Sequence, residues 1–363
     1  MKVLAVAANF DRCEASMLLA LAEQRLIDLT IFTEPGARYN EIFENASVPI
    51  KKVEDRFRSR LDLGAMRRLR ALLKQESFDI MHLFSARAVS NALLASVGLS
   101  IKRVAYRGTM GHLSWFDPSS WLSFLNPGLH KIICVSHAVE NYMQQMGVPS
   151  SRTITIHKGH RLEWYTKTSR SRDAVRQELS IASDAIVVSC VANIRPVKGV
   201  DVLLKGFAKL PLDKQLVLLL IGDIRDNRVE ALIASSPHHD KIITTGFRTD
   251  ATDLIAASDI FIMPSIAREG LAKAAIEAMS KGVATIVTNV GGLPELVLDG
   301  VCGLVIPPSN PDAIADAILR LSNDTNLRNT LAASAPQRIQ EHFHIDTTIH
   351  KTFDVYQSLL SES

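Results

Sequence analysis

The alternation of short apolar runs with helical patterns most constrains what this chain can fold into. The runs are rich in Val, Ile and Leu, and most are apolar throughout rather than at every second residue. Continuous runs of this kind are typical of parallel strands that helices cover on both faces. The expected strands are 2–8, 29–33, 79–84, 103–107, 131–135 and 153–157, then 185–192, 216–221, 242–245, 259–263, 284–288 and 303–306. The sequence therefore predicts an α/β fold with two doubly wound parallel sheets.

A polar stretch without strand signal, residues 166–173, separates the two sets of strands. A length of 363 residues also suits two domains. We expect a first domain over 1–165 and a second over 166–345, with a C-terminal helix over 346–363 that crosses back to the first. Open α/β sheets bind ligands beyond the carboxyl ends of their strands, so we expect the two domains to face each other across a cleft.

Composition narrows the class of protein. A chain that is 47% hydrophobic and 22% charged is globular rather than disordered, and a net charge of +3 argues against a nucleic-acid binder. The apolar N-terminus is too short for a signal peptide, and no run reaches the roughly 18 residues of a membrane span. We therefore expect a cytoplasmic protein. The cysteines lie far apart, so we expect buried thiols rather than zinc or disulfide sites: Cys13, Cys134, Cys190 and Cys302.

Positive charge is concentrated in residues 51–74, where nine Lys and Arg face three acidic residues. Within this stretch, residues 61–73 have helical apolar spacing with arginines between. Such a helix is suited to the inner face of an anionic membrane or to a phosphorylated acceptor. The alternative is a solvated helix face.

Two glutamates, Glu269 and Glu277, lie eight residues apart across an expected helix start near Leu271. Glu269 would lie in the loop at the positive end of the helix and Glu277 in its second turn, about 12 Å further along. The free N–H groups of a helix start favour phosphate. This layout fits a ligand with hydroxyls at both ends and an anion between them, such as a nucleotide diphosphate sugar. The alternative is an amphipathic surface helix with two exposed glutamates.

The loops after other strands of the second half carry cations, glycines and an aromatic residue. Arg195 and Lys198 are placed to neutralise a leaving diphosphate, unless they are ordinary surface cations. Gly222 ends the next strand and allows a ligand to approach the backbone closely. Phe247 and Arg248 follow a further strand, where an aromatic face suits a nucleobase.

In the first half, His112 follows a strand and lies among glycines, so we expect it to face the cleft. His82 lies within a strand and is expected to be a hydrogen-bonded structural residue. The chain has no Asp-x-Asp triplet and no cluster of histidines and carboxylates with ligand spacing. We therefore expect neither a metal nor another cofactor.

Taken in order, these motifs resemble the second domain of the retaining GT-B glycosyltransferases of family 4. The resemblance covers residues 187–321, with a looser match from 132 to 159. The motifs that carry it are Glu269-x7-Glu277, Lys198-Gly199, Pro264-Ser265 and Gly291-Gly292-Leu293-Pro294-Glu295. The resemblance implies the GT-B fold, two Rossmann-like domains that face each other across a cleft.

The resemblance also implies a function. The chain would transfer a sugar from a nucleotide diphosphate donor, a UDP- or GDP-sugar, to a hydroxyl of a saccharide or lipid-linked acceptor, with retention and without metal. The family's habit places this in cell-surface polysaccharide or lipopolysaccharide synthesis. The implied roles are sugar contacts for Glu269 and His112, ribose contacts for Glu277, diphosphate contacts for Lys198, and backbone N–H contacts to sugar and phosphate at Gly270, Leu271, Ala272 and Lys273.

The sequence departs from the family pattern at three places. Asn193 stands five positions before Lys198, where arginine is usual, and we expect Arg195 to take that role. Ala272 replaces a common glycine, and Lys273 adds a cation beside it. Residues 9–14 replace a glycine-rich loop, so contacts to acceptor or phosphate there are open. The alternatives are a nucleotide-sugar epimerase or other GT-B enzyme, and a two-lobed small-molecule binding protein.

Overall fold

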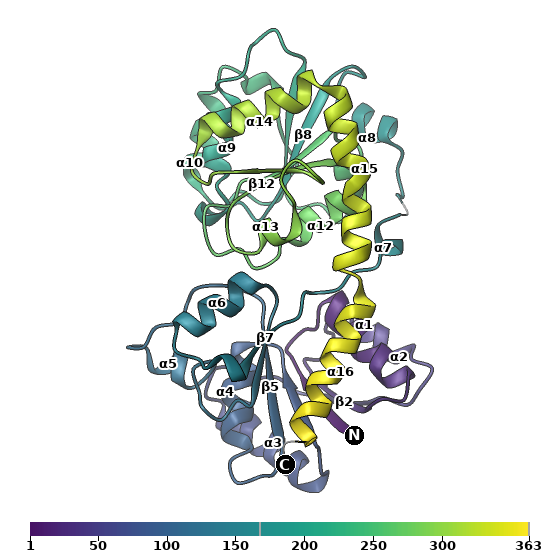
Figure 1. Ribbon diagram of the computed structural model, residues 1–363, viewed down its shortest axis with the longest axis vertical. Coiled ribbons are helices and arrows are strands. Elements are labelled where there is room, and N and C mark those ends of the chain that lie inside the picture. Colours follow the sequence, from purple (N-terminus) through teal and green to yellow (C-terminus); the bar gives the residue numbers. More distant parts are fainter. Residues whose placement is uncertain (167, 362–363) are drawn as a thin grey trace. The chain divides into compact units, whose positions relative to one another are not determined.

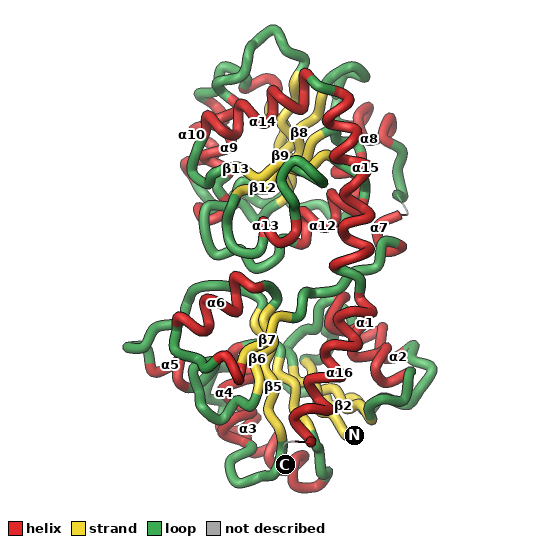
Figure 2. The backbone as a smooth tube through the Cα atoms, viewed as in Figure 1, coloured by secondary structure: helices red, strands yellow, loops and turns green. Residues whose placement is uncertain are grey.

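The computed structural model describes residues 1–166 and 168–361, which form two compact units (Figure 1). Unit 1 consists of Met1–Gly159 and the C-terminal segment that starts at Phe343, and unit 2 is His160–His342. In each unit the strands lie in the centre and the helices around them (Figure 2). The predicted α/β class with two doubly wound sheets is confirmed, and both units are Rossmann-like.

Unit 1 contains a seven-stranded parallel sheet in the order β3-β2-β1-β4-β5-β6-β7. Its strands are β1 (Lys2–Val6), β2 (Asp28–Thr33), β3 (Lys51–Glu54), β4 (Ile80–Leu83), β5 (Lys102–Arg107), β6 (Lys131–Cys134) and β7 (Thr153–Thr155). The central strand β1 pairs in register with both neighbours, so that Val3 lies opposite Leu29 and Ile80. These residues are buried, as the continuous apolar runs predict.

The sequence missed β3, whose segment Lys-Lys-Val-Glu contains one apolar residue. The strand is recognisable only from its pairing, because Thr30 to Thr33 of β2 lie opposite it. It forms the edge of the sheet, where lysine is common since charge discourages pairing with another chain. Part of the basic stretch is therefore a sheet edge.

The helices of unit 1 are α1 (Arg12–Glu23), α2 (Asn40–Glu44), α3 (Leu63–Gln75), α4 (Ala86–Ala95), α5 (Pro118–Trp121), α6 (His137–Gln145) and α16 (Ile345–Ser361). The C-terminal helix α16 packs against α1 (Figure 1). It reaches the sheet through Tyr356, whose hydroxyl lies 2.6 Å from Nδ1 of His82 in β4. The structural role expected for His82 is thereby confirmed, and burial lowers the pKa of its imidazole to about 3.

Unit 2 contains a six-stranded parallel sheet in the order β10-β9-β8-β11-β12-β13. Its strands are β8 (Ile186–Val191), β9 (Leu216–Ile221), β10 (Ile242–Thr244), β11 (Ile260–Met263), β12 (Ala284–Thr288) and β13 (Leu304–Ile306). Its helices are α7 (Glu163–Thr166), α8 (Arg172–Glu178), α9 (Val200–Phe207), α10 (Asn227–Ala234), α11 (Ala251–Ala256), α12 (Lys273–Ser280), α13 (Leu293–Leu296), α14 (Pro311–Asn323) and α15 (Thr325–His342). Each half of the strand order runs outward from β8 or β11, which is the doubly wound topology.

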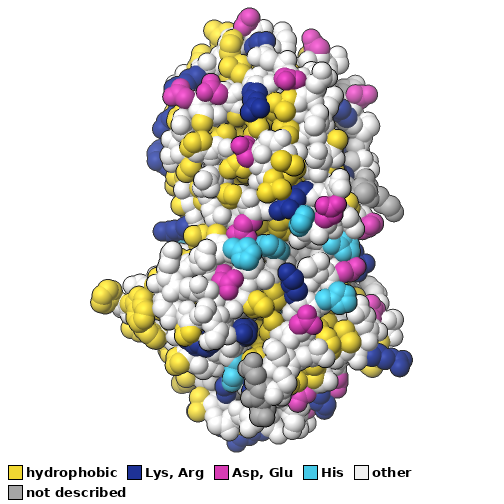
Figure 3. Space-filling view, in the orientation of Figure 1, with side chains coloured by type: hydrophobic (Ala, Val, Ile, Leu, Met, Phe, Trp, Pro, Cys, Tyr) yellow, Lys and Arg dark blue, Asp and Glu magenta, His cyan; other side chains and the backbone are white. Residues whose placement is uncertain are grey.

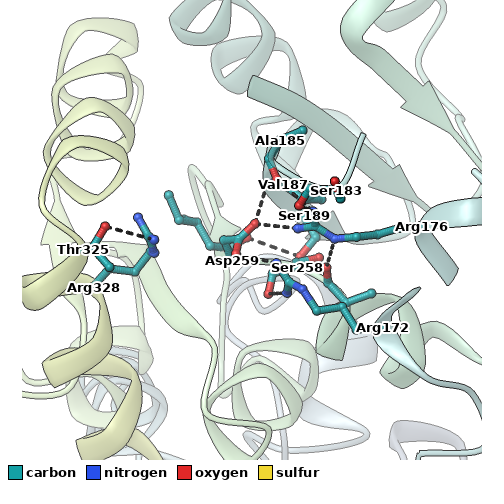
Figure 4. A network of polar contacts seen from close by, with 12 residues as sticks. Arg172, Arg176, Ser183, Ala185, Val187, Ser189, Ser258, Asp259, Thr325 and Arg328 are labelled. Carbon is teal, nitrogen blue, oxygen red and sulfur yellow. Dashed lines mark hydrogen bonds and ion pairs between the residues drawn. The ribbon is translucent and has the colours of Figure 1, made fainter. Parts of the chain in front are cut away.

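A buried arginine fastens α8 to the amino edge of this sheet (Figure 4). Arg176 is 4% exposed and donates to Asp259 Oδ2 at 2.8 Å and to the carbonyl of Ala185 at 2.9 Å. Asp259 also accepts the backbone N–H of Val187 at 2.8 Å and a 2.6 Å bond from Arg172. The guanidinium and the carboxylate neutralise each other's charge. Either group alone would be a buried charge that destabilises the fold.

Candidate active site

Two glycines in unit 2 bring loops from three strands into backbone contact. Gly199 follows β8 at φ +66°, and a Cβ there would lie 2.1 Å from the carbonyl oxygen of Pro264, after β11. Gly291 follows β12 at φ +57°, and a Cβ there would lie 1.7 Å from the carbonyl oxygen of Glu269. Only glycine fits such approaches. The three loops therefore meet at the carboxyl edge of the sheet, where open α/β folds bind ligands.

Glu269 lies where these loops meet. Its side chain is largely buried, and Oε2 accepts hydrogen bonds from Lys198 Nζ and Ser265 Oγ, both at 2.8 Å. The preceding residue, Arg268, has φ +63°, an uncommon conformation for a residue with a side chain. Motifs 71 residues apart in the sequence thus form one charge pair.

Glu277 is also buried, and its Oε1 forms an ion pair with Lys273 Nζ at 3.2 Å. Both glutamates are 8% exposed, which rules out the alternative of two exposed surface glutamates. The helix α12 begins at Lys273 rather than near Leu271, so the helix start predicted from the sequence was two residues early. Glu277 nevertheless lies in its second turn.

The start of α12 has no side-chain cap. Its N-cap residue is Ala272, which lacks a hydrogen-bonding side chain, and Gly270 and Leu271 lead into it. The first amide groups of a helix have no partner within the helix. Here they are available to an anion beside Glu269.

Three other residues expected at the site lie on neighbouring loops. Gly222, after β9, has φ +129°, and a Cβ there would lie 1.9 Å from the carbonyl oxygen of Ala192. Asn193 and Arg195 follow Ala192 and are exposed. Among the described residues, no hydrogen bond or ion pair joins Arg195 to Glu269 or Lys198, and the expected role of Arg195 stays a prediction.

Phe247 and Arg248 differ sharply in their surroundings. The Phe247 ring is 65% exposed, and its backbone N–H is fixed by Asp223 Oδ1 at 3.1 Å. Arg248 instead donates to Asp250 at 2.7 Å and to Glu178 at 2.8 Å. This pairing lowers the pKa of Asp250 to about 2. Any donor contact of Arg248 would have to compete with these carboxylates.

His112 is the one expected site residue in unit 1. It is exposed at φ +63°, directly after Gly111 at φ +82°. Arg107 donates to the carbonyl of Gly111 at 2.6 Å and so fixes this turn. The ring is available to a ligand from solvent, and its role stays a prediction.

Sequence reasoning missed a part-buried charge cluster at the carboxyl edge of the unit 1 sheet. Lys158 Nζ contacts Asp11 and lies 3.0 Å from Glu14 Oε1, with the Tyr106 ring centroid at 4.9 Å. Burial raises the pKa of Glu14, and the positive charge of Lys158 opposes that shift. Part of the cluster had a signal, since Asp11 and Glu14 form the capping box of α1. Nothing in the sequence pointed to Lys158 as their partner.

The four cysteines are free and buried, as expected. Within residues 1–166 and 168–361, no helix has the length and apolarity that crossing a membrane requires.

Two models of known protein families together match most of the chain. The model of the group 1 glycosyl transferases matches residues 171–338, and the model of Glycosyltransferase Family 4 matches residues 15–164. The N-acetyl-alpha-D-glucosaminyl L-malate synthase of Bacillus anthracis is 24% identical over 310 residues, 83% of this chain and 80% of that protein. The D-inositol 3-phosphate glycosyltransferase of Streptomyces bingchenggensis is 30% identical over 233 residues, 60% of this chain but only 50% of that protein. The UDP-Gal:alpha-D-GlcNAc-diphosphoundecaprenol alpha-1,3-galactosyltransferase of Escherichia coli is 23% identical, over 81% of this chain and 79% of that protein.

Solved structures share the fold over nearly the whole chain. A glycosyltransferase of Rickettsia africae ESF-5 gives a TM-score of 0.84 at 20% identity, covering 100% of this chain and 99% of that one. Anabaena HepE in complex with UDP gives 0.82 at 20% identity, covering 99% and 100%. With both halves matched by family models and the GT-B fold in place, the chain belongs to the group 1 glycosyltransferases of family 4.

Proposed function

We propose that the protein is a retaining hexosyltransferase that moves a sugar from a UDP- or GDP-sugar to a hydroxyl of a saccharide or lipid-linked acceptor. The observation that carries this proposal is Glu269, a buried carboxylate paired with Lys198 beside the uncapped start of α12. The relative named for transfer from UDP-Gal, and the UDP and UDP-glucose complexes of HepE, support a nucleotide-sugar donor. Relatives named for lipopolysaccharide and lipid-linked acceptors support polysaccharide or lipopolysaccharide synthesis as the setting. We propose that this synthesis takes place in the cytoplasm.

The donor would lie along the carboxyl edge of the unit 2 sheet. Its diphosphate meets the amide groups from Gly270 to Lys273, which supply hydrogen-bond donors and partial positive charge. Glu277, one helical turn further, accepts hydrogen bonds from the ribose hydroxyls. The base lies toward the exposed Phe247 ring. An aromatic ring can stack on any nucleobase, so this contact does not select one base over another.

The chemical step is the departure of the nucleoside diphosphate. The bond between the sugar anomeric carbon and the phosphate oxygen breaks, and its electron pair stays on that oxygen. Lys198 leaves its contact with Glu269 and pairs with the phosphate instead. The freed Glu269 carboxylate accepts hydrogen bonds from hydroxyls of the sugar. The acceptor oxygen attacks the same face, and its proton passes to the departing phosphate. Cations aimed at this developing charge lower the barrier.

We propose that these cations make a metal ion unnecessary. Lys198, Arg195, Lys273 and the start of α12 would together offset the diphosphate charge. If so, turnover in excess EDTA equals turnover with added Mg²⁺. A rate that falls with EDTA and recovers with Mg²⁺ would contradict this part of the proposal.

Nucleotide binding tests the proposal most directly. UDP, GDP, ADP and CMP would be screened by thermal shift, because a ligand at 100 times its Kd stabilises the folded protein by about 2.7 kcal/mol. The nucleotide sugars of the nucleotide that binds would then be tested as donors. NMR of the product would establish its anomeric configuration. Lys198→Ala serves as the matched control and should weaken the shift. Stabilisation by none of the nucleotides, together with no hydrolysis of any donor, would overturn the proposed function.

A further inference from the structure

Unit 1 carries an exposed patch of large apolar side chains around α5. Hydrophobic side chains project from the surface at the place that α5 occupies in Figure 1 (Figure 3). We call the following residues the aromatic patch: Phe116, 96% exposed, Leu63, 68%, Leu61 and Trp115, both 51%, and Trp121, 38%. Folding of the described chain leaves these side chains in water, and isolated exposed apolar residues are common but such clusters are not.

The aromatic part of the patch is held firmly in this exposed position. Trp121 Nε1 donates to the carbonyl of Trp115 at 2.9 Å, and the two rings are T-shaped with centroids 5.1 Å apart. The Trp115 ring lies so close to Gly147 that a Cβ there would be 2.4 Å from it. Asp117 caps α5 by accepting the N–H of Ser119 at 2.9 Å. The exposure is therefore built into the structure.

Cations border the patch. Arg58 and Arg60 are exposed in the loop that leads into α3, the same loop that carries Leu61. The Arg60 guanidinium contacts the hydroxyl of Ser119 and so joins this loop to α5. An apolar patch with arginines at its side suits a surface that is apolar inside and anionic outside.

The structure also shows why α3 itself is a poor membrane helix. Its apolar face is buried within unit 1 through Ala65, Met66, Leu69 and Leu73. Its Arg68 is paired with Asp55 at 2.5 Å, and Arg70 donates to the carbonyls of Ala95 and Val97. The amphipathic helix predicted for residues 61–73 of the basic stretch therefore has no free apolar face for a membrane. Only the loop before α3 and the first residue of the helix, Leu63, belong to an exposed apolar surface.

We propose that the aromatic patch inserts into the interfacial region of an anionic lipid bilayer. Phe116, Leu61 and Leu63 would enter the acyl boundary, and the indoles of Trp115 and Trp121 would lie at headgroup depth, as tryptophan does at membrane interfaces. Arg58 and Arg60 would contact headgroup phosphates. A projecting patch suits a deformable bilayer, whereas a protein partner would need a recess of matching shape. This inference is independent of the donor and acceptor.

The tryptophans report on this contact. The chain has three, and Trp164→Phe leaves the two of the patch. With large unilamellar vesicles of equal phosphatidylglycerol and phosphatidylcholine, we expect the emission of this variant to shift to the blue and to be quenched by brominated acyl chains. Vesicles of phosphatidylcholine alone should bind far less. Unchanged emission with the anionic vesicles, or equal binding to both, would overturn the proposal.

Substitutions separate insertion from charge. Phe116→Ser should weaken vesicle partitioning about tenfold, because a phenyl ring then no longer leaves water. Leu212→Ser, which removes a side chain 61% exposed in unit 2, is the control and should have no effect. Arg58→Ser and Arg60→Ser should each weaken binding about fivefold at low salt and little at 0.5 M salt.

Two further outcomes would overturn the proposal. In one, the wild-type protein is a dimer without lipid, and Phe116→Ser makes it a monomer while no vesicle binds. In the other, Phe116→Ser and Leu212→Ser reduce vesicle partitioning equally, which would mean adsorption without a defined site. Circular dichroism of each serine variant should match the wild-type spectrum, since Phe116, Leu212, Arg58 and Arg60 are exposed.

Discussion

The two units are both doubly wound parallel sheets, but they hold the loops at their carboxyl edges in different ways. Unit 2 brings its loops into backbone contact at Gly199 and Gly291, and the Lys198–Glu269 ion pair connects two of the same loops. Unit 1 joins its loops through a side chain, since Lys158 bridges the end of the sheet to Asp11 and Glu14 at the start of α1. The same topology thus leaves different chemistry free at the two edges.

The consequence concerns which charges a ligand can take over. In unit 2 each buried glutamate has a single lysine partner, so an incoming phosphate and sugar can exchange partners without leaving a charge alone. In unit 1 one lysine serves two carboxylates, and removing it for a ligand would leave the buried Glu14 without this cation. We therefore interpret the unit 2 edge as a binding site and the Lys158 cluster as a fastening of α1.

The largest expected effect would come from breaking the fastening in unit 1. Lys158→Met should destabilise unit 1 by about 4 kcal/mol, because Glu14 stays buried without its cation. Hydrogen exchange measured by mass spectrometry should show faster exchange in α1 and unchanged exchange in unit 2. Lys74→Met, at an exposed position, is the control. Equal protection of α1 in both variants would contradict the interpretation of the cluster.

The next effect tests the cation of the unit 2 site. Lys198→Ala should lower kcat by about 10²–10³-fold, since the charge that develops on the diphosphate loses its nearest cation. Lys198→Arg should recover part of the rate. Arg195→Ala should lower kcat less but measurably. If turnover of Arg195→Ala equals that of the wild type, the role predicted for Arg195 is wrong.

The backbone contact of unit 2 can be broken at one glycine. Gly291→Ala should destabilise unit 2 by about 3 kcal/mol, because the Cβ meets the carbonyl of Glu269 and φ is positive. Gly300→Ala is matched in φ, at +69°, but has open space around it. It should cost about 1 kcal/mol. Equal losses of thermal midpoint in the two variants would show that φ alone, and not loop contact, requires glycine at position 291.

The smallest effect concerns pH and the Arg248 network. The pKa of Asp250 falls from 3.8 to about 2 on folding, so its ionised form stabilises the fold above pH 3.8, and this stabilisation is lost as the pH falls toward 2. Because the group is partly solvated, the contribution is about 1 kcal/mol. Asp250→Asn should lower the urea midpoint at pH 5 and have little effect at pH 2.5. Asp240→Asn, on an exposed side chain, should change neither.

How far the sequence could be interpreted depended on where each contact partner lies. Strands with continuous apolar runs were found within a few residues, because burial on both faces leaves a local signal. The edge strand β3 was missed, since its Lys51 and Lys52 look like surface charge until β2 is seen beside them. The start of α12 was placed two residues early, because Ala272 is not a typical N-cap.

Within the candidate site, motif order was informative and side-chain pairing was not. The sequence placed Glu269, Glu277 and Lys198 at one edge of a sheet, because the ends of parallel strands meet there. It gave no sign that Lys198 and Ser265 share one oxygen of Glu269, or that Arg248 is held by Asp250 and Glu178.

The sequence by itself determined the class of fold, the two sheets, and the set of loops that carry the candidate site. These follow from hydrophobic periodicity and from glycines, whose signals are local in the chain. Only the tertiary structure decided which charges neutralise each other, such as Lys158 with Glu14, 144 residues away. It also decided which apolar residues stay exposed, such as Phe116. The physical reason is that ion pairing and burial depend on distances in space. Two residues can come into contact at almost any separation along the chain, so the sequence does not show which pairs do.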